Sequence, residues 1–98
     1  MKYIFNDMGF QKEGLFVQVA LGSPANIRIM DKENFDKFKK LEPHDFIGGY
    51  VKFTPYVVKL PRDAHWIVVV DLGGNEGKLS AAVSTYQKER QVKKTLIT

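Results

Sequence analysis

Two histidines and one aspartate are the side chains of this sequence best suited to chemistry. His44 lies beside Asp45 after a proline, and His65 lies beside Trp66. A zinc site needs several convergent ligands, and nucleophilic catalysis needs a base with an orienting partner. The two histidines are 21 residues apart and form no HxH or HxxxH pattern. We therefore expect a loop histidine and a strand-entry histidine that bond to the backbone, with no metal ion and no cofactor.

Asp71 is the third candidate because it ends an apolar segment and precedes Gly73 and Gly74. Burying a carboxylate is costly unless N–H groups or a basic side chain pair with it. We favour a structural role, in which Asp71 accepts hydrogen bonds from the glycine turn, over a ligand-binding role. A small hydrolase that combines His65 with Asp71 is less favoured, because six positions along a straight strand separate the two by about 20 Å.

Two further segments have compositions that occur in binding sites. Residues 73–77 read GGNEG but lack the GxxxxGK[ST] and GxGxxG spacings of phosphate-binding loops, so we expect a hairpin connection with positive φ angles. Residues Tyr50 to Tyr56 interleave aromatic side chains with Lys52. Such a run could stack nucleic-acid bases on an open sheet face. Aromatic side chains of a small β domain more often pack in its core, which is the role we expect here.

The elements that must position these side chains are mostly short strands. Glycine and proline turns punctuate the chain, and apolar side chains alternate with polar ones between them, as in half-buried strands. The segment from Trp66 to Leu72 is apolar on both faces up to Asp71, which predicts a central strand covered on both sides. We expect an all-β fold, a small sandwich or partly open barrel of about seven strands. The alternating sets are Leu15, Val17, Val19 and Leu21; Tyr56, Val58 and Leu60; and Leu79, Ala81 and Val83.

One short helix over about residues 32–41 interrupts this pattern. Asp31 is a good N-cap, and the residue before it, Met30, is spaced to pack on Phe35 as a hydrophobic staple. Phe35, Phe38 and Leu41 form one apolar stripe. Lysines near its end suit the helix dipole, and a proline at position 43 prevents continuation.

The charge of the chain is concentrated at its end. Its 98 residues include 15 Lys and Arg against 11 Asp and Glu, a formal net charge of +4. Such a balance is typical of nucleic-acid binders. Residues 88–98 hold four basic residues and one acid, a net of +3, so residues 1–87 carry only +1. We therefore divide the chain into one β-rich domain over 1–87 and a basic C-terminal tail over 88–98.

The composition excludes several classes of protein. The chain has no cysteine, which rules out disulfides, thiolate metal sites and cysteine nucleophiles. The longest unbroken apolar run, Trp66 to Val70, is far shorter than the ~20 residues that cross a bilayer. No basic stretch followed by an apolar stretch opens the chain as a secretory signal would. We expect no membrane contact.

Several segments together resemble a bacterial family, the domain of unknown function numbered eighteen eighty-three, over about residues 1–87. Its members are stand-alone proteins or modules fused to TIR domains. The resemblance implies a small β-rich domain in the bacterial cytoplasm and no known reaction. The matching segments are residues 7–9, 25–31, 34–35, 48–49 and above all the string HWIVVVDLGG over residues 65–74, followed by Gly77.

These observations favour a non-catalytic binding or sensing module that recognises a small ligand or a protein, with self-association through an edge strand as a second form of it. The alternatives are nucleic-acid binding through the tail and the Tyr50 to Tyr56 surface, and the small hydrolase. The residues that we expect at the site lie in loops and at strand ends: Arg28, His44, Asp45, His65, Asp71 and Asn75.

Overall fold

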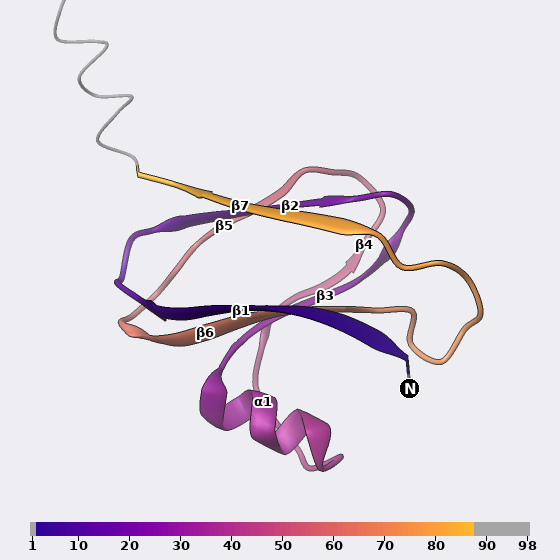
Figure 1. The fold of residues 1–98 in the computed structure, drawn as a ribbon, viewed down its shortest axis with the longest axis horizontal. Coiled ribbons are helices and arrows are strands. Elements are labelled where there is room, and N and C mark those ends of the chain that lie inside the picture. The colour runs from indigo at the N-terminus through magenta and orange to yellow at the C-terminus, as the bar shows by residue number, and fades with distance from the viewer. Residues whose placement is uncertain (1, 88–98) are drawn as a thin grey trace, which may run out of the picture.

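The computed structural model describes residues 2–87, which form seven strands and one helix arranged as a sandwich of two antiparallel sheets (Figure 1). One sheet has the strand order β1-β6-β3-β4, and the other has the order β5-β2-β7. The predicted small all-β sandwich with one short helix is therefore confirmed. The elements are β1 (Tyr3–Gln11), β2 (Phe16–Leu21), β3 (Ala25–Asp31), α1 (Lys32–Lys39), β4 (Ile47–Val51), β5 (Tyr56–Lys59), β6 (Ala64–Asp71) and β7 (Ala81–Tyr86).

The main core lies between the two sheets. Alternate residues of β2 and β3 point into it, so that Val17 and Val19 face Ile27 and Ile29 across the sandwich, all fully buried. Strand alternation places every second side chain on one face. The same rule explains why the polar partners of these residues, such as Gln18, lie outside the core.

β6 is the central strand of the larger sheet and is covered on both faces. Trp66, Val68 and Val70 belong to the core between the sheets, whereas Ile67 and Val69 pack with the aromatic side chains of α1. β6 pairs with β1 on one side and β3 on the other. The prediction of a doubly covered central strand is confirmed.

The helix begins as predicted and ends two residues early. Asp31 accepts the Asn34 backbone N–H at 2.9 Å as the N-cap, and Phe35 and Phe38 are buried. The helix ends at Lys39, and Leu41 is 87% exposed with φ of 62°. The expected place of Leu41 in the buried stripe is therefore wrong, because the chain turns out of the helix before it.

The glycine-rich segment after β6 is not a hairpin connection. β6 and β7 belong to different sheets, so residues 73–77 carry the chain from one layer of the sandwich to the other (Figure 1). The expected positive φ angles are present, with 62° at Gly73, 90° at Gly74 and 145° at Gly77. Glycine composition indicated the backbone conformation correctly, but it carried no information about which strand follows.

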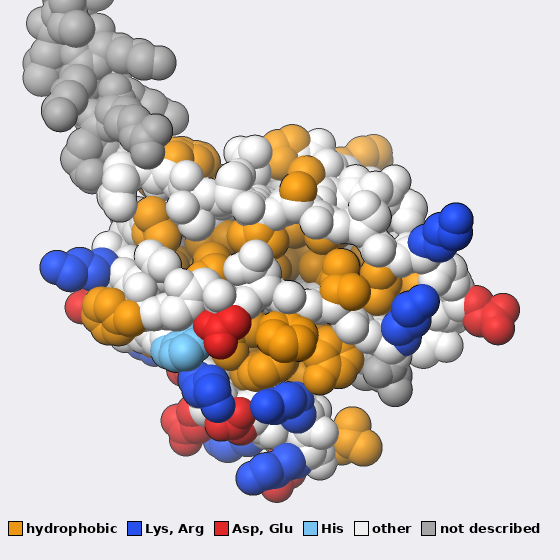
Figure 2. Space-filling view, viewed as in Figure 1, with side chains coloured by type: hydrophobic (Ala, Val, Ile, Leu, Met, Phe, Trp, Pro, Cys, Tyr) orange, Lys and Arg blue, Asp and Glu red, His pale blue; other side chains and the backbone are white. Residues whose placement is uncertain are grey.

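One side of the sandwich is open where the edge strands β1 and β7 face each other. Ile4 and Asn6 of β1, with Ala81 and Val83 of β7, line a cavity of about 120 Å³ that reaches Val68 in the core. Figure 2 shows hydrophobic side chains along this opening between the layers.

Candidate functional site

Arg28 and Asp71 form an ion pair on the outer face of the larger sheet, the face that carries α1. They project from neighbouring strands, β3 and β6, and Asp71 is the direct cross-strand partner of Asn26. The Asp71 carboxylate accepts three hydrogen bonds: from Arg28 Nε at 2.7 Å, from Asn26 Nδ2 at 2.9 Å and from the Gly73 backbone N–H at 2.8 Å. The predicted bond to the glycine turn is confirmed, and the basic partner is Arg28.

This environment keeps Asp71 ionised although its side chain is 0% exposed. Burial alone would raise the pKa of the carboxyl, but the bonds from Asn26, Arg28 and Gly73 outweigh it and hold the pKa below its ordinary value. Removal of any one donor would leave a buried charge short of partners, which is costly. Asp71 is therefore a fixed anchor for Arg28.

The Arg28 guanidinium lies close to two aromatic rings. Its Cζ is 4.9 Å from the centroid of the Phe46 ring and 5.6 Å from that of Phe38. Only Nε is used by Asp71, and the Nη nitrogens have no hydrogen-bond partner within residues 2–87. A guanidinium offers its five N–H donors in a rigid fork that fits carboxylate and phosphate groups. Asp71 holds Nε and the two rings lie against the guanidinium, so the Nη edge of Arg28 remains available to a ligand.

His44 stands in the same group of side chains. Its ring centroid is 5.4 Å from that of Phe38 and 5.8 Å from that of Phe46. Nδ1 donates to the Glu42 carbonyl at 2.9 Å, which confirms the expected backbone bond. Nε2 is buried and has no partner among the described residues. A buried nitrogen without a partner costs about 1–3 kcal/mol, so a structural role alone accounts poorly for it.

These side chains line a surface pocket of about 460 Å³, which we call the Arg28 pocket. Arg28, His44 and Glu42 are its polar lining residues, and Phe38 and Phe46 form aromatic walls. Its outer rim comes from the turn after α1, between the helix and β4. The rim residues are Leu41, Glu42 and Pro43.

Gly48 fixes the strand beside this pocket. It is the cross-strand partner of Arg28 and has φ of 130°. A Cβ atom there would lie 2.2 Å from the Ile27 carbonyl oxygen, far inside van der Waals contact. Only glycine allows β4 to pass so close to β3, and Phe46 comes directly before β4.

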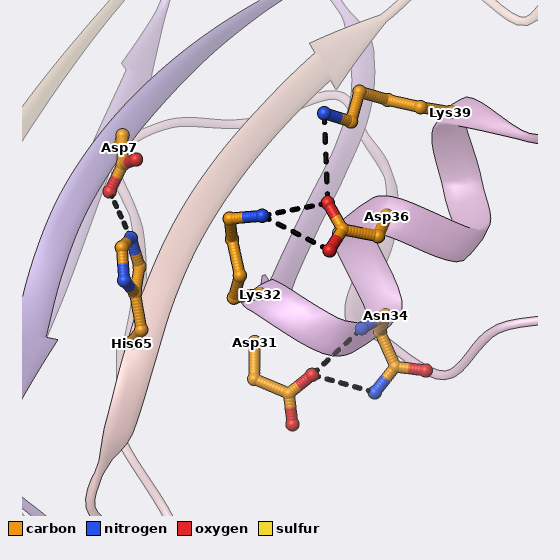
Figure 3. Close-up of polar contacts among 7 residues, drawn as sticks. All are labelled: Asp7, Asp31, Lys32, Asn34, Asp36, Lys39 and His65. Carbon is orange, nitrogen blue, oxygen red and sulfur yellow. Dashed lines mark hydrogen bonds and ion pairs between the residues drawn. The ribbon is translucent and has the colours of Figure 1, made fainter.

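His65 lies elsewhere on the outer face and pairs with a side chain. Its Nε2 is 2.6 Å from the Asp7 carboxylate of β1, next to the first turn of α1 (Figure 3). The expected backbone bond of His65 is therefore wrong, because β1 places a carboxylate within reach. The Gly9 backbone N–H, followed by the His65 ring, lowers the pKa of Asp7. His65 and Asp71 thus have different partners, and the dyad required by the hydrolase hypothesis is not formed.

The structure also separates Asp45 and Asn75 from the Arg28 pocket. Asp45 donates its backbone N–H to the Asn34 side chain and lines a smaller cavity near Trp66. Asn75 lies in the exposed loop between β6 and β7. Of the six predicted site residues, Arg28, Asp71 and His44 are brought together, and Asp45, His65 and Asn75 are not.

The expected core role of Tyr50 to Tyr56 is wrong for two of its aromatic residues. Tyr50 is 62% exposed on β4, and Phe53 is 87% exposed between β4 and β5. Tyr56 packs against the core. The segment spans a turn between two sheets and not one strand, so its alternation does not point one set of side chains inward.

The sequence analysis missed Phe38, Phe46 and Leu41 as residues of the site. Phe38 was interpreted only as a core residue of the helix. The one signal for Leu41 was local: helices commonly end in a left-handed residue that is usually glycine, and none stands between Asp31 and Pro43. A bulky residue in that conformation suggests a demand other than stability.

Residues 2–87 contain no group of three or more His, Asp or Glu side chains that could hold a metal ion. In the same described part of the chain, no helix is long and apolar enough to span a membrane.

Comparison with known families decides the relationship of the chain. The family described as Domain of unknown function (DUF1883) matches residues 1–89. The chain belongs to this family. The match covers all seven strands of the DUF1883 domain and confirms the resemblance seen in the sequence. No curated protein and no solved structure matches the chain.

Proposed function

We propose that this DUF1883 domain is a non-catalytic binding module, and that the Arg28 pocket holds an anionic group of its ligand. The proposal is carried by one observation: Arg28 is fixed through Nε to a buried carboxylate while its Nη edge has no partner among the described residues and lines a pocket. The Arg28 side chain keeps 20% of its surface exposed, so a ligand can reach it. Two donors in a fixed geometry suit a carboxylate or a phosphate oxygen pair.

The chemistry around the pocket supports binding and not catalysis. Its only imidazole is tied through Nδ1 to a backbone carbonyl, and no hydroxyl nucleophile is among the residues that line it. Nucleophilic catalysis would require a nucleophile within hydrogen-bond reach of a base. The aromatic walls hold the Arg28 guanidinium through cation–π contacts, which leaves its Nη donors for an anion.

The test is a titration with acetate and with inorganic phosphate at constant ionic strength, followed by two-dimensional amide NMR. We expect saturable shifts at the Arg28 Nε–H and at the backbone of Phe46 and His44. Arg28→Lys keeps the charge but loses the fork, and should weaken binding about tenfold or more, as loss of a charge-assisted bidentate contact predicts.

Arg62→Lys is the matched control. Arg62 also pairs with an aspartate, Asp31, and lies over an aromatic ring, that of Trp66, but at the smaller cavity away from Arg28. It should bind the anions as the parent does. Shifts that are linear in anion concentration, or that survive in Arg28→Lys, would contradict the proposal.

Nucleic-acid binding is a second candidate because Tyr50 and Phe53 expose their rings beside Lys52. The basic tail that would share in it lies outside the described residues. Fluorescence anisotropy with a single-stranded oligonucleotide should then show an affinity that falls with salt and on removal of residues 88–98. Tyr50→Ala should reduce it further, since one stacked base is worth about 1–3 kcal/mol. Absence of binding at low salt would end this candidate.

The bacterial origin, the cytoplasmic location and the fusion to TIR domains remain predictions from the family resemblance. Self-association also remains a prediction. It is supported by the unpaired edge of β1, where Phe5 is 55% and Phe10 is 63% exposed. Sedimentation velocity over a range of concentrations tests it.

A further inference from the structure

Leu41 occupies a position that the fold alone would give to glycine. The Glu42 N–H bonds to the Lys37 carbonyl at 2.9 Å, and the Leu41 N–H bonds to the Phe38 carbonyl at 3.1 Å. This pair of bonds is the Schellman motif, in which the residue at the place of Leu41 is left-handed and usually glycine. Leu41 has φ of 62°. This left-handed conformation is unfavourable for any residue that has a Cβ atom.

The side chain of Leu41 does not offset this cost by packing in the core. It is 87% exposed, and the apolar contact that accompanies the Schellman motif involves the neighbouring positions and not this one. The leucine is therefore strained in its backbone and solvated in its side chain. Its position on the rim of the Arg28 pocket gives it a different use.

Apolar side chains make up most of the rim, beside the exposed Glu42. Leu41, Pro43 and Phe46 are exposed around the pocket, and Phe46 is 41% exposed. A pocket for a small molecule usually covers most of its ligand, with only a few polar groups in the wall. A hollow bounded by exposed side chains instead suits a ligand whose body continues outside it.

We infer that the Arg28 pocket binds the C-terminal end of a protein chain whose last residue is apolar. The terminal carboxylate binds the Nη edge of Arg28, and the last side chain packs on Leu41, Pro43 and Phe46. This inference rests on the proposed function, since it gives the anion at Arg28 a source.

The first test uses an acetylated tetrapeptide that ends in leucine with a free carboxylate, measured by the same NMR titration. Its C-terminal amide should bind at least about tenfold more weakly, because the charged contact to Arg28 is lost. The same peptide ending in glycine should bind about tenfold more weakly or worse, as loss of one largely buried leucine side chain predicts. N-acetylleucine should also bind more weakly than the tetrapeptide.

Leu41→Gly provides a readout that a structural role would not give. Glycine adopts the positive φ without strain, so the melting temperature should rise by about 2–6 °C. Affinity for the leucine-ending peptide should nevertheless fall about threefold to fivefold. Phe53→Ala is the matched control, since Phe53 is equally exposed but lies outside the pocket.

The outcomes separate the two proposals. If acetate binds at Arg28 but the amide or N-acetylleucine binds as well as the tetrapeptide, the inference is wrong and the proposed function stands. If Leu41→Gly leaves peptide affinity unchanged, the rim is not the contact and the inference is also overturned. If neither acetate nor phosphate binds at Arg28, the proposed function itself fails.

Discussion

Asp71 determines what Arg28 can do. A surface arginine without a fixed partner moves among many rotamers, and ordering it on a ligand costs free energy. Here the ordering is done by the fold, through the bond from Nε to the carboxylate and the two rings beside the guanidinium. The site is therefore preorganised at the level of one side chain.

Asp71→Asn should destabilise the domain by about 2–4 kcal/mol at pH 7, because it removes the charge that three donors surround. The folded-state pKa of Asp71 lies below its ordinary value, so its contribution is present above pH ~4 and is lost as the pH falls through the folded-state value. The difference between parent and variant should therefore shrink in acid. Urea unfolding from pH 7 to pH 2.5, followed by Trp66 fluorescence, measures it.

Asp36→Asn is the control for Asp71. Asp36 also has a lowered pKa, chiefly through its bond from Lys32, but its side chain is 42% exposed and pairs with Lys32 and Lys39 (Figure 3). Exposed ion pairs contribute little to stability. An Asp71→Asn variant as stable as Asp36→Asn at pH 7 would show that the buried pair does not anchor the site.

At the scale of single residues, the sequence pointed to Asp71 but not to Arg28 as its ion-pair partner. An aspartate after an apolar strand and before two glycines has one local source of donors, which led to the correct Gly73 contact. Arg28 is 43 residues away, and its approach depends on the register of β3 against β6. A shift of one residue would turn Arg28 to the other face, and no local pattern specifies that register.

The turn after α1 and the start of β4 form the elements that hold the pocket. Both depend on unusual backbone: Leu41 in the left-handed region and Gly48 at φ of 130°. Both lie where the chain leaves the helix and returns to the sheet edge. The pocket is therefore shaped by two short segments with little freedom to change.

Gly48→Ala should destabilise the domain by about 3 kcal/mol or more, since it adds a close contact with the Ile27 carbonyl to the cost of the positive φ. Gly49→Ala is the matched comparison, because Gly49 has φ of 148° but its added Cβ atom meets nothing within 4 Å. It should cost about 1–3 kcal/mol. Equal losses in thermal unfolding would mean that the contact between β3 and β4 relaxes freely.

Elements with strong local patterns were predicted well. The apolar run of β6 and the N-cap of α1 depend on neighbouring residues only. The helix end at Lys39 was missed because Leu41 fitted the helical period, and the tertiary structure uses it otherwise. The prediction of a hairpin after β6 was wrong, because two strands joined by a glycine-rich loop can belong to different sheets.

At the scale of the whole molecule, we predict that the domain ends close to Tyr86. The last described strand ends there, and its ring stacks on Phe16 of β2 with centroids 5.0 Å apart. The family match extends only to residue 89. It therefore covers every described strand and the first two residues of the predicted tail.

A chain of residues 1–87 should therefore unfold at the same urea concentration as the full chain. A chain ending at residue 85 loses the stack of Tyr86 on Phe16 and should be destabilised by about 1–2 kcal/mol. Both are measured by urea unfolding under one set of conditions. A large loss on removal of residues 88–98 would show that the domain boundary is wrong.

The order of strands in the two sheets also determines when this protein can acquire structure during its synthesis. Only β3 and β4 are paired neighbours along the chain, whereas β1 pairs with β6, and β2 pairs with β5 and β7. A nascent chain that has not yet delivered β6 has neither the partner of β1 nor the centre of the larger sheet. Such distant pairings are slow to form, typically in milliseconds to seconds. The emerging chain must therefore keep its apolar strands from other partners until nearly its whole length has left the ribosome.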